Sequence, residues 1–130
     1  MSARPERLLV AAAATAGCFG VAVSAAASHG GGGPGLETAG RFLLFHAPAL
    51  LGLAAASRTG LLHRPTGLAA GALLVSGLVL FSGDLSIRAV YGVALFRMSA
   101  PLGGIALMAG WAVLAASTVI GGRESRRTLP

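Results

Sequence analysis

The sequence predicts an all-α fold: an integral membrane four-helix bundle with up-down topology. Three observations predict it. Hydrophobic residues make up 55% of the 130 residues and charged residues only 11%, whereas soluble domains carry about 25% charged residues. Four windows contain no Arg, Asp or Glu, namely 8–28, 42–57, 65–83 and 98–122. Short arginine-containing segments flank these windows, as is typical of membrane spans. We expect one transmembrane domain, residues 1–130.

The first helix is expected at about 8–28, which is long enough to span a bilayer at 1.5 Å per residue. Arg4 and Arg7 followed by an apolar run and Ala25–Ser28 also resemble a secretory signal peptide, and Thr15–Cys18 is a degenerate lipobox. A lipobox normally opens with a large aliphatic residue, and the charge-free run is long for a signal peptide. The sequence therefore favours an uncleaved helix over a signal peptide or a lipoprotein.

The second helix is expected at about 37–57. Its charge-free window, 42–57, is short for a span. The helix reaches spanning length if it also includes Glu37 and Arg41, an acid-before-base i,i+4 pair suited to the headgroup region.

The third helix is expected at about 66–90, directly after Pro65, a residue type suited to a first helical turn. Its extension past the charge-free window places Asp84 and Arg88 one turn apart on one helix. The fourth helix is expected at about 99–121.

Arginine counts predict the orientation. Seven arginines fall on one side of the predicted spans and three, Arg41, Arg88 and Arg97, on the other. Because arginines concentrate on the cytoplasmic side, both termini should be cytoplasmic. The lack of lysine and the abundance of Ala, Gly and Arg suggest a GC-rich bacterial genome, so we expect the bacterial cytoplasmic (inner) membrane. The predicted partner of the basic residues is the lipid bilayer and not nucleic acid, since they flank apolar runs instead of forming one basic face.

Polar residues within the spans are the candidate functional residues, because each must be paired or face water. A set of them is expected to converge on one leaflet: His29, His46, Asp84 and Arg88, with Glu37, Arg41 and Ser82. One interpretation is a proton-linked or metal-binding pocket. In the other, His46 donates a hydrogen bond to a neighbouring helix while Asp84 and Arg88 neutralise each other. No metal-ligand spacing occurs, so we assign no metal site and no cofactor.

Small residues predict close helix contacts. Gly67 and Gly71 form a Gly-xxx-Gly step, and Gly103, Gly104 and Gly110 place glycine along the fourth helix. These faces either pack within the chain or dock a partner subunit or a second copy. Trp111, near the middle of the fourth helix, is expected to be a packing residue.

Catalytic motifs are not apparent. Ser82 lies in Phe81–Gly83 without a nucleophile elbow, and no phosphate-binding or dinucleotide-binding glycine pattern occurs. We therefore assign no enzymatic activity. Three functions remain open: an accessory or assembly subunit of a membrane complex, a small oligomeric transporter or ion-handling or proton-handling protein using His46, Asp84 and Arg88, and a subunit binding haem, copper or a quinone through His29 or His46.

Several sequence blocks resemble a known family. The blocks are Leu36–Ala39, Arg41–Phe42, Phe45–Ala47, Ala49–Leu50, Leu80–Leu85, Ala100–Gly104 and Gly110–Trp111. Their identity and order resemble the domain-of-unknown-function 423 family, small multi-pass membrane proteins of bacteria that include the animal transmembrane protein 256. The resemblance spans about residues 8–120. It implies a four-helix membrane fold and an uncleaved first helix ending at His29, and it implies no activity.

Overall fold

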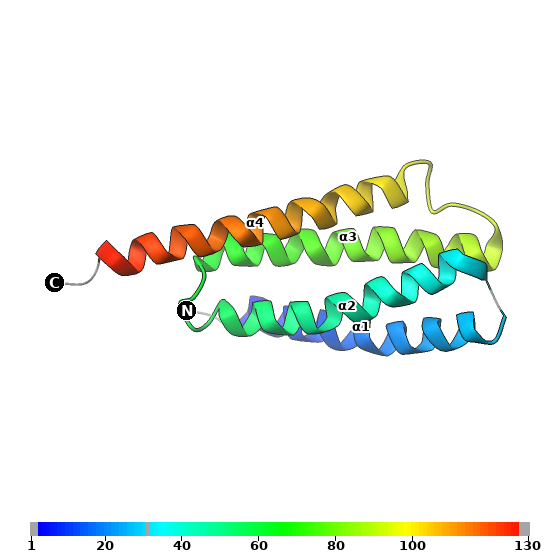
Figure 1. Cartoon of the computed structure of the whole chain (residues 1–130), viewed down its shortest axis with the longest axis horizontal. Helices are drawn as coiled ribbons and strands as arrows, with labels where there is room; N and C mark the ends of the chain where they lie inside the picture. The colour runs from blue at the N-terminus through cyan, green and yellow to red at the C-terminus, as the bar shows by residue number, and fades with distance from the viewer. Residues whose placement is uncertain (1–2, 31, 128–130) are drawn as a thin grey trace.

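The computed structural model describes residues 3–30 and 32–127, with side chains described up to residue 121. These residues form four long helices and no strand: α1 (Arg4–Ser28), α2 (Gly33–Ala56), α3 (Arg64–Tyr91) and α4 (Ser99–Arg127). The helices alternate in direction, so the start of α1 and the end of α4 lie at the same end of the molecule (Figure 1). We call this end the Arg4 end and the opposite one the His29 end.

Prolines define where three of the helices begin. Pro5, Pro34 and Pro65 each lie in the first turn of α1, α2 and α3. Proline suits this position because the first N–H groups of a helix have no partner within it. As a result, α1 and α2 each begin four residues before the starts predicted from the sequence, which were positions 8 and 37.

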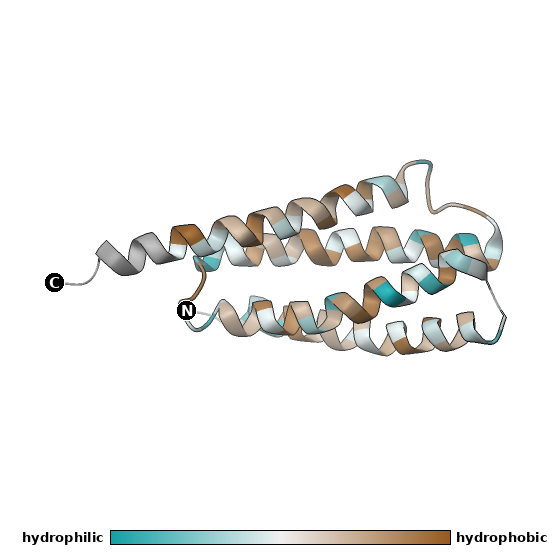
Figure 2. Cartoon of the chain, viewed as in Figure 1, coloured by the Kyte–Doolittle hydropathy of each residue, from teal (hydrophilic) through white to brown (hydrophobic). Residues whose placement is uncertain are grey.

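All four helices are long and apolar enough to cross a membrane. Hydrophobic residues occur along α1, α2 and α3 and along α4 as far as residue 121 (Figure 2). The all-α four-helix membrane fold that the sequence predicts is confirmed.

The bundle is open along one side. α1 packs extensively on α2, α3 on α4, and α2 on α3, whereas α1 and α3 touch only over a short stretch. Among the described residues, no Cα of α4 lies within 8 Å of a Cα of α1 or α2. Accordingly 39% of the apolar window is buried in each of α2 and α3, but only 22% in α1 and in α4. The two middle helices form the core and the outer two flank it.

The core combines leucines with small residues. Leu50 and Leu74 are fully buried, as are the alanines Ala39 and Ala70, and Ala13 is nearly so. Helices in a bilayer gain stability from such close packing because lipid tails are as apolar as leucine.

Glycines allow the closest approaches between the helices. A Cβ on Gly103 of α4 would lie 2.5 Å from the backbone nitrogen of Phe81, and one on Gly77 of α3 would lie 2.8 Å from the carbonyl oxygen of Gly103. Real side chains do not tolerate such distances, so α3 and α4 meet backbone to backbone here. Gly77 was not among the glycines singled out from the sequence.

The other predicted packing glycines differ in how closely neighbouring side chains approach them. A Cβ on Gly71 would come within 2.7 Å of Leu9, and one on Gly110 within 2.8 Å of Leu74. At Gly67 the nearest atom, Ser57 Oγ, would be 3.2 Å away, and at Gly104 the nearest atom would be at an ordinary 3.9 Å. Gly71 and Gly110 therefore require close approach, whereas Gly104 does not.

Candidate functional site

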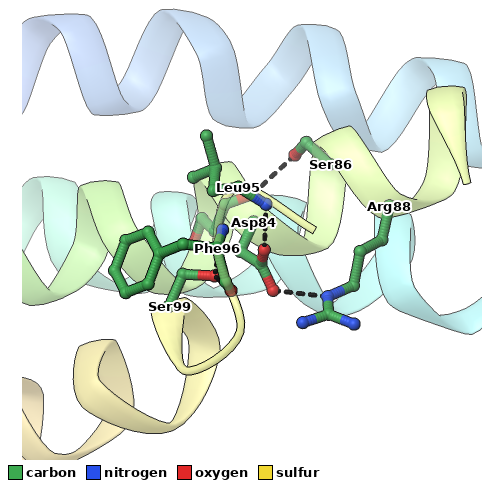
Figure 3. Close-up of polar contacts among 7 residues, drawn as sticks. Asp84, Ser86, Arg88, Leu95, Phe96 and Ser99 are labelled. Carbon is green, nitrogen blue, oxygen red and sulfur yellow. Dashed lines mark hydrogen bonds and ion pairs between the residues drawn. The ribbon is translucent and has the colours of Figure 1, made fainter. Parts of the chain in front are cut away.

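A fully buried carboxylate, Asp84, lies near the His29 end of α3. Its Oδ2 accepts a hydrogen bond from Arg88 Nε at 2.5 Å, one turn further along the same helix. Its Oδ1 accepts the backbone N–H of Leu95 at 2.8 Å, in the connection between α3 and α4 (Figure 3). Both carboxylate oxygens therefore have partners, and one of those partners belongs to the loop.

Ser99, at the start of α4, makes a further hydrogen bond in the same region. Its side chain is fully buried, and its hydroxyl donates to the carbonyl oxygen of Phe96 at 2.8 Å. The Ser99 hydroxyl also adjoins the Asp84 carboxylate. The sequence analysis did not identify Ser99 or the Leu95 amide, although a serine at the start of a predicted helix is a capping residue type.

His46 of α2 is buried, with 7% of its surface exposed, and both ring nitrogens are engaged. Nδ1 lies 2.8 Å from the carbonyl oxygen of Phe42, and a carbonyl can only accept, so Nδ1 carries the proton and donates. Nε2 is then free to accept, and Trp111 Nε1 donates to it at 3.3 Å. The ring is held between its own helix and α4.

This geometry changes two details of the predictions. In one of the two interpretations of the sequence, His46 donates a hydrogen bond to a neighbouring helix; it does bond to a neighbouring helix, but as the acceptor, because a tryptophan N–H can only donate, and it donates to its own helix. Trp111 was expected to be only a packing residue, but it carries that hydrogen bond.

Aromatic rings continue the contact into α3. The ring of Phe42 stacks on His46 with centroids 5.8 Å apart and meets Phe81 of α3 at 4.5 Å. The rings of His46 and Trp111 are 5.9 Å apart. Three helices thus meet at one aromatic cluster, composed of Phe42, His46, Phe81 and Trp111.

The residues predicted to form one polar cluster lie in different parts of the bundle and make separate contacts. His46 lies thirteen residues into α2, which is about 20 Å from the start of the helix at 1.5 Å per residue. Asp84 pairs with Arg88 near the His29 end, and His29 itself is exposed just after α1. In the described part of the chain, no hydrogen bond or ion pair joins His46 to the other three. No group of three or more metal-ligating side chains was found there either.

The remaining residues of the predicted set are Glu37, Arg41 and Ser82, and their polar contacts lie within their own helices. Glu37 and Arg41 form an exposed ion pair at 2.5 Å on α2, as their spacing predicts. Ser82 is buried, and its hydroxyl has no hydrogen-bond partner among the described residues. The backbone carbonyl of Ser82 accepts from Ser86 at 2.7 Å.

A second charged contact, which the sequence analysis missed, lies at the Arg4 end. Oε1 of Glu6 on α1 lies 2.6 Å from Nε of Arg64 on α3, and the Glu6 side chain is only 4% exposed. The two residues are 58 positions apart, so no local pattern links them. This ion pair connects two helices that otherwise touch only over a short stretch.

Comparison with known proteins gives a family match for this chain. No solved structure matches the chain. Residues 16–104 match the model of a family described as "Protein of unknown function (DUF423)". That segment covers more than half of the chain and includes α2, α3 and most of α1. The chain therefore belongs to the DUF423 family.

Proposed function

We propose that this protein is a non-catalytic accessory or assembly subunit of a membrane complex in the bacterial cytoplasmic membrane, with both termini in the cytoplasm. The arginine distribution supports the orientation, since seven of ten arginines belong to segments at the Arg4 end. The short connections between the helices support a role carried by the membrane-embedded surface.

The free face of α4 is the observation that carries this proposal. Within the described residues, the backbone of α4 packs closely on α3 alone, and Trp111 adds a side-chain hydrogen bond to His46 of α2. The opposite face of α4 exposes large apolar side chains, including Ile105 at 58% and Met108 at 67%. A helix that packs closely on one neighbour leaves room for a partner helix on its other face, and helix association in membranes uses such unpartnered faces.

The alternative of an ion-handling or proton-handling protein receives less support. Both oxygens of Asp84 and both ring nitrogens of His46 already have partners within the chain. A haem or copper ligand would need a free nitrogen on His46, and Nε2 is engaged by Trp111.

Site-specific photocrosslinking in native membranes tests the proposal. A photoreactive amino acid at Ile105 or Met108 should crosslink to one discrete protein, identified by mass spectrometry after mild solubilisation. The same probe at Val21, which is 62% exposed on α1, is the matched control. Absence of any protein adduct from the α4 positions, together with elution of the native protein as a lipid-coated monomer, would contradict a subunit role.

A further inference from the structure

A groove runs between α1 and α3 and is floored by α2. It has a volume of about 550 Å³. Its α1 wall extends from Ala12 to Val23, its α3 wall from Val75 to Ser86, and Leu43 and Leu50 of α2 contribute to the floor. The groove exists because α1 packs mainly on α2 and touches α3 only over a short stretch.

The groove is lined almost entirely by apolar side chains. Three hydroxyl residues lie on its walls, and two of them are satisfied within their own helices: Thr15 donates to the carbonyl of Ala11, and Ser86 to that of Ser82. No charged residue lines it. Since its walls belong to helices apolar enough to span a membrane, the groove opens toward hydrocarbon and not toward water.

The length of the groove along the helix axis matches the thickness of the hydrocarbon region of one leaflet. From Val75 to Ser86 is eleven residues, or about 16 Å along the helix axis, and half of a typical hydrocarbon core is about 15 Å. Ser86 lies five residues from the end of α3 and Val23 five residues from the end of α1, both at the His29 end. The groove therefore runs from near the midplane toward the headgroups of one leaflet.

We propose that this groove binds one acyl chain of a phospholipid from the leaflet at the His29 end. A single hydrocarbon chain is apolar and one leaflet long, as the groove is. A transmembrane helix from a second copy crosses both leaflets, so it is longer than the groove. The seated chain extends the apolar packing of α1 against α3.

Native mass spectrometry with groove-filling variants tests this proposal. The protein is reconstituted in vesicles of phosphatidylethanolamine and phosphatidylglycerol, extracted in mild detergent, and washed. The wild-type chain should retain one phospholipid. Thr15→Trp fills the groove from the α1 wall and should reduce the retained phospholipid by about tenfold or more, equivalent to at least about 1.4 kcal/mol of binding free energy.

Two further variants make the result decisive. Val79→Trp fills the groove from the α3 wall, so it replaces Thr15→Trp if that variant does not fold. Val21→Trp is the matched control, because Val21 is an exposed β-branched residue of α1 that does not line the groove, comparable in exposure to Val79 at 62% against 64%. The control should retain phospholipid as the wild type does.

Three outcomes would overturn the proposal. Equal phospholipid retention by the groove-filling variants and the wild type would show that the lipid binds elsewhere. Retention of a different apolar molecule, such as a prenylated quinone, would change the ligand class. A change of oligomeric state in the groove-filling variants but not in Val21→Trp would assign the groove to a second copy of the chain.

Discussion

The indole N–H of Trp111 donates to Nε2 of His46 across 3.3 Å, and this bond joins α4 to α2 although their described backbones nowhere approach within 8 Å. Two long side chains therefore span a gap that no backbone contact closes. Trp111 is 46% exposed but the His46 ring is buried, and a buried polar group without a partner costs free energy.

Removal of this bond should loosen α4. His46→Ala and Trp111→Phe should each destabilise the protein, and a double-mutant cycle should give a coupling of about 0.5–1.5 kcal/mol, the usual range for one hydrogen bond. The measurement is unfolding in mixed detergent micelles. Additive effects of the two substitutions would show that the side chains do not interact.

The Asp84 carboxylate should control the order of the connection between α3 and α4. Asp84→Ala removes the acceptor for both Arg88 and the Leu95 amide, and a hydrogen bond to a charged group contributes about 1.5–3 kcal/mol. Asp84→Asn should lose less, because its side-chain carbonyl still accepts. Thermal unfolding in detergent measures stability, and the labelling rate of a cysteine placed at Val93 measures the mobility of the loop.

The double variant Asp84→Ala with Arg88→Ala separates the two roles of the carboxylate. It should recover only part of the stability lost in Asp84→Ala, because it no longer strands the guanidinium but leaves the Leu95 amide without its acceptor. Complete recovery would show that the loop contact contributes nothing, and no recovery would show that the ion pair contributes nothing.

Neighbouring glycines on α4 should differ sharply in their tolerance of a methyl group. Gly103→Ala places a Cβ against the Phe81 backbone and should cost about 1–3 kcal/mol, as overpacking of a tight contact does. Gly104→Ala places it in ordinary contact and should be neutral or stabilising by about 0.5–1 kcal/mol, because alanine favours the helix. Thermal unfolding monitored by size-exclusion chromatography compares them, and equal melting temperatures would refute the close contact between α3 and α4.

Two ion pairs at opposite ends should also differ. Glu6→Ala should loosen α1 at the Arg4 end, because Glu6 is buried and bonds across to Arg64 of α3. Glu37→Ala should have little effect, since the pair between Glu37 and Arg41 is exposed and lies within one helix. Hydrogen exchange of the first turns of α1 in detergent should accelerate only in Glu6→Ala. Unchanged exchange there would show that the cross-helix pair does not hold α1.

Local patterns in the sequence predicted the features that local physics controls. Charge-free windows predicted the four spans because the cost of burying a charge in hydrocarbon depends only on which residues are in the segment. The spacing of Asp84 and Arg88 predicted their ion pair because residues four apart lie on the same face of a helix. Proline positions explain why α1 and α2 begin earlier than hydropathy alone indicates.

Only the tertiary structure decided which distant residues meet. His46 and Trp111 are 65 positions apart, and Glu6 and Arg64 are 58 apart. Helix periodicity gives the face that a residue occupies but not the rotation or neighbour of its helix, and these depend on the packing of all four helices at once. The same packing leaves α1 against α2 and α4 against α3, and so creates both the free face of α4 and the groove between α1 and α3.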